Sequence, residues 1–191
     1  MTDETFQAIL RIEKFMDTVA DANPLPREAA EFVHALILAT QARRALEIGT
    51  SYGYSGLWMA AALKQNGGRL VTIDQSNEKT KTARANIEGA GLGHLVELRT
   101  GTALEVIPKL AGQFDFVLND ADKEHCIAYV ELLIDKLADR AVVLTDNTLT
   151  HPKELAGFLD WIRRYPRFTS AHVLIGNGME MSVWRGANHD D

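Results

Sequence analysis

The chain has 191 residues, 46% of them hydrophobic and 24% charged, which is the composition of a globular protein with one domain. Its net charge of −6, with no basic run longer than Arg43-Arg44 or Arg163-Arg164, argues against a nucleic-acid partner. The single cysteine, Cys126, excludes a disulfide framework and a cysteine-rich zinc site. With neither a signal-peptide pattern nor an apolar run of membrane-spanning length, we expect a cytoplasmic protein with no membrane partner.

The spacing of apolar residues predicts helices and strands that alternate along the chain. Helices are expected at residues 3–22, 26–44, 57–66, 76–89, 102–110, 123–138 and 152–165. Strands are expected at residues 45–48, 70–74, 95–98, 114–118, 141–145, 170–175 and 179–184. We therefore expect a single domain over residues 1–191, with an N-terminal helix in residues 1–25 and a core in residues 26–186.

This alternation indicates an α/β fold, in which a doubly wound, mostly parallel sheet carries helices on both faces. The end of the chain breaks the pattern, because only Gly176-Asn177-Gly178 joins the last two strands. Asn-Gly between two apolar runs is typical of a hairpin, and so short a link leaves no room for a crossover. The last two strands must therefore be antiparallel to each other.

The first strand leads into a glycine turn and a helix, the unit that places a ligand against backbone N–H groups. Its glycines are spaced as Gly49-x-x-x-Gly53-x-x-Gly56, whereas a dinucleotide loop has Gly-x-Gly-x-x-Gly. Glu47 lies two residues before the first glycine, where a carboxylate would repel phosphates. It would suit a ligand with an amino group and a sulfonium, so the turn favours S-adenosylmethionine (SAM) over NAD.

Polar residues follow four of the strands, and ligands of a doubly wound sheet bind at these strand ends. Asp74 ends the second strand, where a carboxylate can accept both hydroxyls of a ribose, or can cap the next helix. Asp120, Asp146 and Asn147 follow two strands expected to be neighbours. Two carboxylates and an amide oxygen suit Mg²⁺, or Ca²⁺ or Mn²⁺, and do not suit zinc.

Four motifs in this order resemble those of the cation-dependent O-methyltransferases of the catechol and caffeoyl-CoA type. They are Leu-Glu-Ile-Gly-Thr-x-x-Gly-Tyr-Ser, Phe-Asp-Phe-x-x-x-Asp-Ala-Asp-Lys, Asp-Asn and the Gly-x-Gly hairpin. The resemblance extends from about Pro26 to Arg185. It implies a class I methyltransferase fold, which is a Rossmann-like sheet of seven strands, mostly parallel, with an antiparallel strand at the C-terminal end.

The resemblance also implies roles for individual residues and a partner. The divalent cation would be bound by Asp120, Asp146 and Asn147, and Lys123 matches the general base. The residues expected in the SAM site are Glu47, Gly49, Ser55, Asp74, Ala103, Asp120, Asp122 and Tyr129. The substrate would be a small aromatic molecule with two neighbouring hydroxyls. The protein would be a homodimer, because members of the family usually pair and the N-terminal helix has no assigned partner.

Some positions depart from the family pattern and concern the substrate. Cys126 stands where an aromatic residue is usual, and the segment after Asn147 is short, so we expect an open pocket. His125 and His151 lie beside the predicted site, and His172 is the polar residue nearest to a missing substrate carboxylate.

Two other functions remain open from the sequence. One is a metal-independent SAM methyltransferase that acts on a nitrogen, a protein or RNA. The other is a nucleotide-binding protein without catalysis, or an NAD enzyme.

Overall fold

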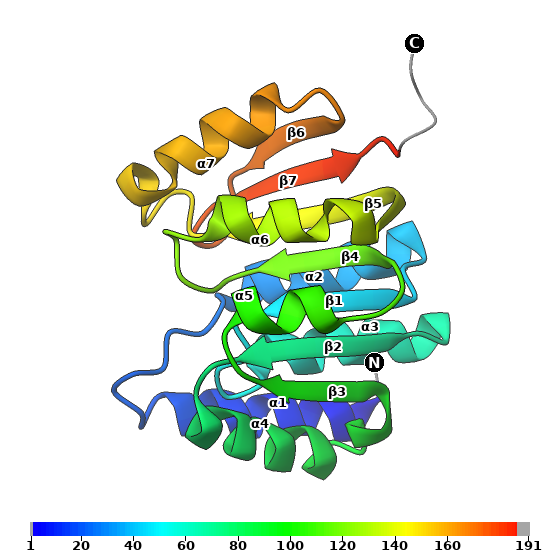
Figure 1. The fold of residues 1–191 in the computed structure, drawn as a ribbon. Helices are drawn as coiled ribbons and strands as arrows, with labels where there is room; N and C mark the ends of the chain where they lie inside the picture. Colours follow the sequence, from blue (N-terminus) through cyan, green and yellow to red (C-terminus); the bar gives the residue numbers. More distant parts are fainter. Residues whose placement is uncertain (1, 187–191) are drawn as a thin grey trace.

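The computed structural model describes residues 2–186, which form one seven-stranded sheet in the order β3-β2-β1-β4-β5-β7-β6 (Figure 1). The strands, in chain order, are β1 Arg44–Ile48, β2 Arg69–Asp74, β3 Val96–Thr100, β4 Phe114–Asn119, β5 Leu137–Asp146, β6 Phe168–Val173 and β7 Met179–Trp184. The pairs among β3, β2, β1, β4 and β5 are parallel, and β7 is antiparallel to both β5 and β6. The predicted α/β sheet with an antiparallel C-terminal strand is confirmed.

Helices cover both faces of the sheet. They are α1 Asp3–Met16, α2 Arg27–Thr40, α3 Tyr54–Asn66, α4 Asn77–Gly89, α5 Ala103–Val106, α6 Cys126–Leu133 and α7 Pro152–Arg164. Single 3-10 turns lie at Gly93–Leu95, Ile107–Lys109 and Ile134–Lys136. One apolar core gathers α1, α2 and α3 against the sheet, and a second core gathers α6 and α7 on the opposite face.

The helix after the glycine turn is apolar around most of its circumference. Every residue from Leu57 to Leu63 in α3 is buried, and α2, α1 and β2 all pack against this helix. A helix that is covered on several sides needs no polar face. The first turn of α3 is therefore held rigidly against the carboxyl end of the sheet, where the cavity lies.

The structure shortens several of the predicted helices, among them α2, which ends at Thr40, and α5, which ends at Val106. The helix predicted at 3–22 ends at Met16, because Thr18 and Val19 make tight turns with backbone bonds to Phe15 and Met16. The helix predicted at 123–138 is α6 followed by a 3-10 turn, and β5 already begins at Leu137. Arg140 has a φ of 61°, and the register of β5 against β4 shifts there. This irregularity divides β5 into two segments, and the sequence pattern predicted only the second of them, residues 141–145.

The apolar face of α1 is covered within the same chain. Ala8, Ile9, Ile12 and Met16 are buried in the core with α2 and α3. The N-terminal helix therefore has a partner within the chain, which removes one of the two reasons for the expected homodimer, and the dimer stays a prediction. Among residues 2–186, the structure has no helix long and apolar enough to span a membrane.

Candidate functional site

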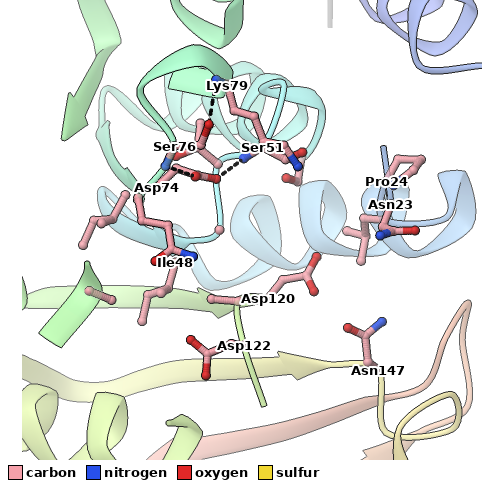
Figure 2. Close-up of a pocket in the computed structure, with 18 of the residues that line it drawn as sticks. Asn23, Pro24, Ile48, Ser51, Asp74, Ser76, Lys79, Asp120, Asp122 and Asn147 are labelled. Carbon is pink, nitrogen blue, oxygen red and sulfur yellow. Dashed lines mark hydrogen bonds between the residues drawn. The ribbon is translucent and has the colours of Figure 1, made fainter. Parts of the chain in front are cut away.

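A cavity of about 900 Å³ lies at the carboxyl ends of β1, β2, β4 and β5. Its walls come from the glycine turn after β1, the loops after the other three strands, and the segment 17–26 between α1 and α2 (Figure 2). Small-molecule sites have volumes of roughly 300–1,000 Å³, so this cavity is at the upper end of that range. Its size suits two small molecules bound side by side.

The glycine turn has the backbone geometry that the spacing of its glycines predicts. Gly49 and Gly53 have φ angles of 108° and 86°, which side chains other than glycine rarely adopt. Gly53 precedes α3, and the backbone N–H of Leu57 donates to its carbonyl. Gly49 lines the cavity directly, so the turn presents backbone rather than side chain to a ligand.

Glu47 lies behind the cavity wall and not in it. Its side chain is fully buried, and its two oxygens accept hydrogen bonds from Ser55 Oγ at 2.5 Å and Thr72 Oγ1 at 2.6 Å. Burial raises the pKa of Glu47 to about 7, although both hydroxyls oppose the shift. Ser55 does line the cavity, so Glu47 contacts the site through Ser55.

Asp74, at the end of β2, lines the cavity and joins two segments of its wall. Its Oδ2 accepts the backbone N–H of Ser51 at 2.7 Å, and its Oδ1 accepts that of Ser76 at 2.8 Å (Figure 2). Ser76 itself caps α4 by accepting from the N–H of Lys79. Asp74 therefore holds the backbone of Ser76, which is the residue that caps α4, and faces the cavity as well.

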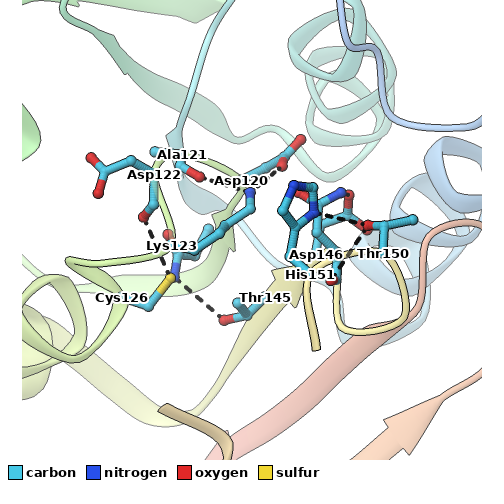
Figure 3. A network of polar contacts seen from close by, with 11 residues as sticks. Asp120, Ala121, Asp122, Lys123, Cys126, Thr145, Asp146, Thr150 and His151 are labelled. Carbon is cyan, nitrogen blue, oxygen red and sulfur yellow. Dashed lines mark hydrogen bonds and ion pairs between the residues drawn. The ribbon is translucent and has the colours of Figure 1, made fainter. Parts of the chain in front are cut away.

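The predicted metal ligands meet at the ends of β4 and β5. Asn119 pairs with Thr145 in the sheet, which brings the following residues, Asp120 and Asp146, side by side (Figure 3). Asp120 and Asn147 line the cavity, and Asp146 is fully buried beneath them. Asn147 has a φ of 71°, and its Nδ2 donates to Asp146 Oδ2 at 2.8 Å, so its amide oxygen is the atom left for a ligand.

The donor set of this cluster fits a hard divalent cation. Burial raises the pKa of both Asp120 and Asp146, and the charge of Asp146 raises that of Asp120 further. Asp146 Oδ1 is buried without a hydrogen-bond partner. Lys123 supplies one positive charge to this pair of carboxylates, and an oxygen-binding cation would supply more. Residues 2–186 contain no group of three or more His, Cys, Asp or Glu side chains placed for a metal, and the third donor expected at this cluster is the amide oxygen of Asn147.

Lys123 is the cation nearest to these carboxylates. Its Nζ lies 3.4 Å from Asp120 Oδ1 and donates to the carbonyl of Ala121 at 2.7 Å. The side chain is 15% exposed and lines the cavity (Figure 3). An amine in this position can exchange a proton with a molecule bound next to Asp120.

The three remaining residues predicted for the SAM site also line the cavity, namely Ala103, Asp122 and Tyr129. Asp122 accepts a hydrogen bond from Tyr129 OH at 2.8 Å and contacts His125 Nδ1 at 2.6 Å. Burial raises the pKa of Asp122, but the bonds to His125 and Tyr129 outweigh it and lower the pKa overall. The carboxylate of Asp122 is therefore held ionised at the edge of the cavity.

Comparison with known proteins identifies the family of this chain. The family model described as O-methyltransferase matches residues 5–160, which is most of the chain. The chain belongs to the O-methyltransferase family. Its relatives include a catechol O-methyltransferase of Mycobacterium tuberculosis, 40% identical over 136 residues that make up 68% of this chain and 61% of that enzyme. Caffeoyl-CoA O-methyltransferase 1 of Arabidopsis thaliana is 33% identical over 77% of this chain and 59% of its own length.

Solved structures of O-methyltransferases have the same fold. The crystal structure of an O-methyltransferase from Bacillus cereus in complex with SAH (S-adenosylhomocysteine) superimposes on this chain with a TM-score of 0.83 at 30% identity. The superposition covers 97% of this chain and 92% of that one. In contrast, the chain spans about three fifths of the length of the curated relatives it matches.

Sequence reasoning missed one wall of this O-methyltransferase cavity. The segment 17–26 contributes Asp21, Asn23, Pro24 and neighbouring residues to the lining. Pro24 and Pro26 predicted a break between two helices, but they did not predict that the segment would lie against the cavity. Asn177, in the hairpin between β6 and β7, also lines the cavity.

The histidines differ in their relation to the cavity. His125 and His151 line it, and His151 Nδ1 lies 3.1 Å from Thr150 Oγ1. His172 does not line it, because its Nε2 is hydrogen-bonded to Thr148 Oγ1 at 2.8 Å. His172 is therefore placed to support the loop after β5.

Proposed function

We propose that this protein is a SAM-dependent O-methyltransferase that needs a divalent cation and acts on a small aromatic molecule with two neighbouring hydroxyls. One observation carries the proposal. A single cavity contains the glycine turn with Asp74 and the cluster of Asp120, Asn147 and Lys123. A methyl donor bound at the first group and a diol bound at the second would share one enclosed space. Family membership supports this interpretation.

The cofactor would be held by backbone on one side and by carboxylates on the other. Gly49 gives the ligand close access to the turn, and Asp74 offers its remaining acceptor capacity to the ribose hydroxyls. Ser55 donates its hydroxyl proton to Glu47, which leaves the lone pairs of Ser55 to accept from the amino group of SAM. Ala103, Asp122 and Tyr129 complete the pocket.

The cation would be held by Asp120, Asp146 and Asn147. When bound, it supplies positive charge that makes the acceptor hydroxyls more acidic. The protein's own contribution is geometric, because β4 and β5 fix the two carboxylates and the left-handed conformation of Asn147 turns its amide toward Asp146. An acceptor bound there would lie next to Lys123 Nζ.

In the reaction, Lys123 in its uncharged amine form takes the proton of the acceptor hydroxyl, and the oxygen forms a bond to the methyl carbon. The bond from that carbon to sulfur breaks, so that the sulfonium becomes a neutral thioether. Because the positive charge of SAM disappears in this step, an ionised oxygen is the better nucleophile. The walls of the cavity hold donor and acceptor in line, which is the main gain that positioning gives.

A methyl-transfer assay with catechol and isotope-labelled SAM tests the proposal. We expect labelled product with Mg²⁺ and none after treatment with EDTA, with recovery when Mg²⁺ is restored. Activity that EDTA leaves unchanged would favour a metal-independent methyltransferase. Calorimetry with SAM, S-adenosylhomocysteine (SAH) and NAD completes the test, because binding of NAD alone would overturn the proposal.

A further inference from the structure

The segment 17–26 forms a wall of the cavity but has little packing of its own. Met16 and Leu25, at its two ends, are 8% and 3% exposed and belong to the core. Between them, no residue from 17 to 24 is buried. In Figure 1 this stretch projects from the sheet as an extended connection between α1 and α2. Its position therefore depends on a few contacts.

Asp21 makes these contacts. Its Oδ1 accepts a hydrogen bond from Tyr52 OH at 2.7 Å, and its Oδ2 lies 2.9 Å from Lys79 Nζ. Lys79 Nζ also donates to the backbone carbonyl of Asp21 at 3.3 Å. Within the described part of the chain, the polar side-chain contacts that join residues 17–24 to α3, α4 and the glycine turn all involve Asp21.

The two partners of Asp21 also contact each other. Lys79 Nζ lies 5.3 Å from the centre of the Tyr52 ring, a cation–π geometry, and Phe15 packs edge-on against the same ring at 5.4 Å. The hydrogen bond to Asp21 raises the pKa of Tyr52 to about 12, so the phenol keeps the proton that it donates. The tether is a connected group and not a single surface ion pair.

Both partners belong to the half of the cavity where Asp74 lies. Tyr52 follows Ser51, whose N–H is bound by Asp74, and the N–H of Lys79 is bound by Ser76. Figure 2 shows Asn23 and Pro24 away from Asp74, on the side of Asn147. Asp21 and Asn23 are two residues apart, which is at most about 7 Å of chain. The glycine turn is therefore linked to Asn23 and Pro24 through Asp21 and a short length of chain.

We propose that Asp21, Tyr52 and Lys79 form a latch that couples the cofactor half of the cavity to the wall formed by residues 22–26, with Asp21 as a positioning residue. The proposal rests on the proposed function only in taking the bound molecule at Asp74 to be SAM or SAH. A ligand that orders the glycine turn then also orders the wall. The coupling is reciprocal, so a methyl acceptor bound against the wall would in turn strengthen the binding of SAM or SAH.

Hydrogen exchange and calorimetry test the latch on the whole protein. Tyr52→Phe removes one hydroxyl and keeps the ring contacts with Phe15 and Lys79, so the variant should fold. Asp21→Ala removes both side-chain contacts of the tether and leaves only the bond from Lys79 Nζ to the backbone carbonyl at position 21. Asp17→Asn is the control, because Asp17 is an exposed acid of the same segment that does not line the cavity.

In the wild type, SAH should slow backbone exchange in residues 17–24. In Tyr52→Phe and Asp21→Ala this protection should be lost, and the Kd for SAH should rise roughly 3- to 10-fold, the range for one net hydrogen bond. The control should match the wild type in both measurements. A structural role alone would change the melting temperature without removing the protection.

Equal protection of residues 17–24 by SAH in the wild type and in both latch variants would overturn the proposal. If SAH does not bind the wild type, the proposed function fails, and the latch is then judged on ligand-free exchange. Faster exchange in the two latch variants than in Asp17→Asn would support the tether, and equal exchange would overturn it.

Discussion

Gly49 and the backbone carbonyl of Asp120 are in direct contact, so close that a Cβ atom on Gly49 would lie 2.8 Å from the carbonyl carbon and closer still to the oxygen. The contact joins the turn after β1 to the loop after β4. The N–H of Asp120 also donates to the carbonyl of Ile48. The predicted cofactor turn and the predicted metal loop are therefore packed directly against each other. We expect a substitution in one of them to alter the geometry of the other.

Gly49→Ala should disrupt both halves of the site. The new methyl group meets backbone, which cannot move as a flexible side chain can, and the φ of 108° is unfavourable for alanine. We expect a loss of stability of roughly 1–3 kcal/mol together with loss of SAM binding. Urea unfolding and calorimetry with SAM measure the two effects.

Gly157→Ala is the matched control for this prediction. Gly157 lies inside α7, and a Cβ there would meet nothing within 4 Å. Replacing glycine by alanine in a helix should leave SAM binding unchanged and stabilise the protein by roughly 0.5–1 kcal/mol. A Gly49→Ala protein that bound SAM like the wild type would show that the contact with Asp120 can relax.

Asp74→Ala should weaken SAM binding by roughly 1–3 kcal/mol, the range for hydrogen bonds to a charged group. Asp115→Ala is the control, because Asp115 also accepts two backbone N–H groups, those of Arg43 and Arg44, but does not line the cavity. Both variants should lose stability, and only Asp74→Ala should lose affinity in calorimetry. Unchanged SAM affinity in Asp74→Ala would show that Asp74 serves only to bind the backbone N–H groups of Ser51 and Ser76.

The positions of Asp74, Asp120 and Asn147 could be predicted from the sequence, because parallel strands carry their carboxyl ends to one edge of the sheet. Each of these residues follows an apolar run that marks a buried strand. The antiparallel pairing of β6 and β7 could be predicted for a similarly local reason, since Asn177 and its flanking glycines leave no room for a crossover.

The remaining features depend on contacts between distant parts of the chain. The contact of Glu47 with SAM stays a prediction, because the hydroxyls of Ser55 and Thr72 hold its carboxylate in the interior, behind the residues that line the cavity. Asp21 joins Tyr52, which is 31 positions away, and no local pattern marks either residue. A pattern of apolar spacing identifies the ends of strands, and it does not show which loop will cover them.

Glu47 should make the stability of the protein depend on pH. Burial raises its pKa to about 7 from 4.5, so the folded state binds this proton more tightly than the unfolded chain. The stabilisation is complete below pH 4.5 and is lost as the pH rises through 7. The shift corresponds to about 3 kcal/mol at most.

Glu47→Gln removes this contribution, because an amide does not ionise. Urea unfolding of both proteins at several pH values between 4.5 and 8 should show the wild type losing stability relative to the variant. The side chains of Ser55 and Thr72 can rotate to accept from the amide, so the variant should keep its fold. Parallel pH profiles for the two proteins would contradict the predicted shift of the Glu47 pKa.

Lys123 and Asp146 should fail in different ways when they are replaced. Lys123→Ala removes the expected base, and kcat should fall by roughly 10²- to 10⁴-fold while SAM and Mg²⁺ still bind. Asp146→Ala removes an expected metal ligand, so Mg²⁺ binding and activity should be lost together. Lys136→Ala is the control, because Lys136 Nζ also donates to a carbonyl, that of Leu110, at 2.7 Å but does not line the cavity. Calorimetry with Mg²⁺ and a catechol assay separate the three variants. Near-normal turnover in Lys123→Ala would leave the cation as the group that activates the hydroxyl.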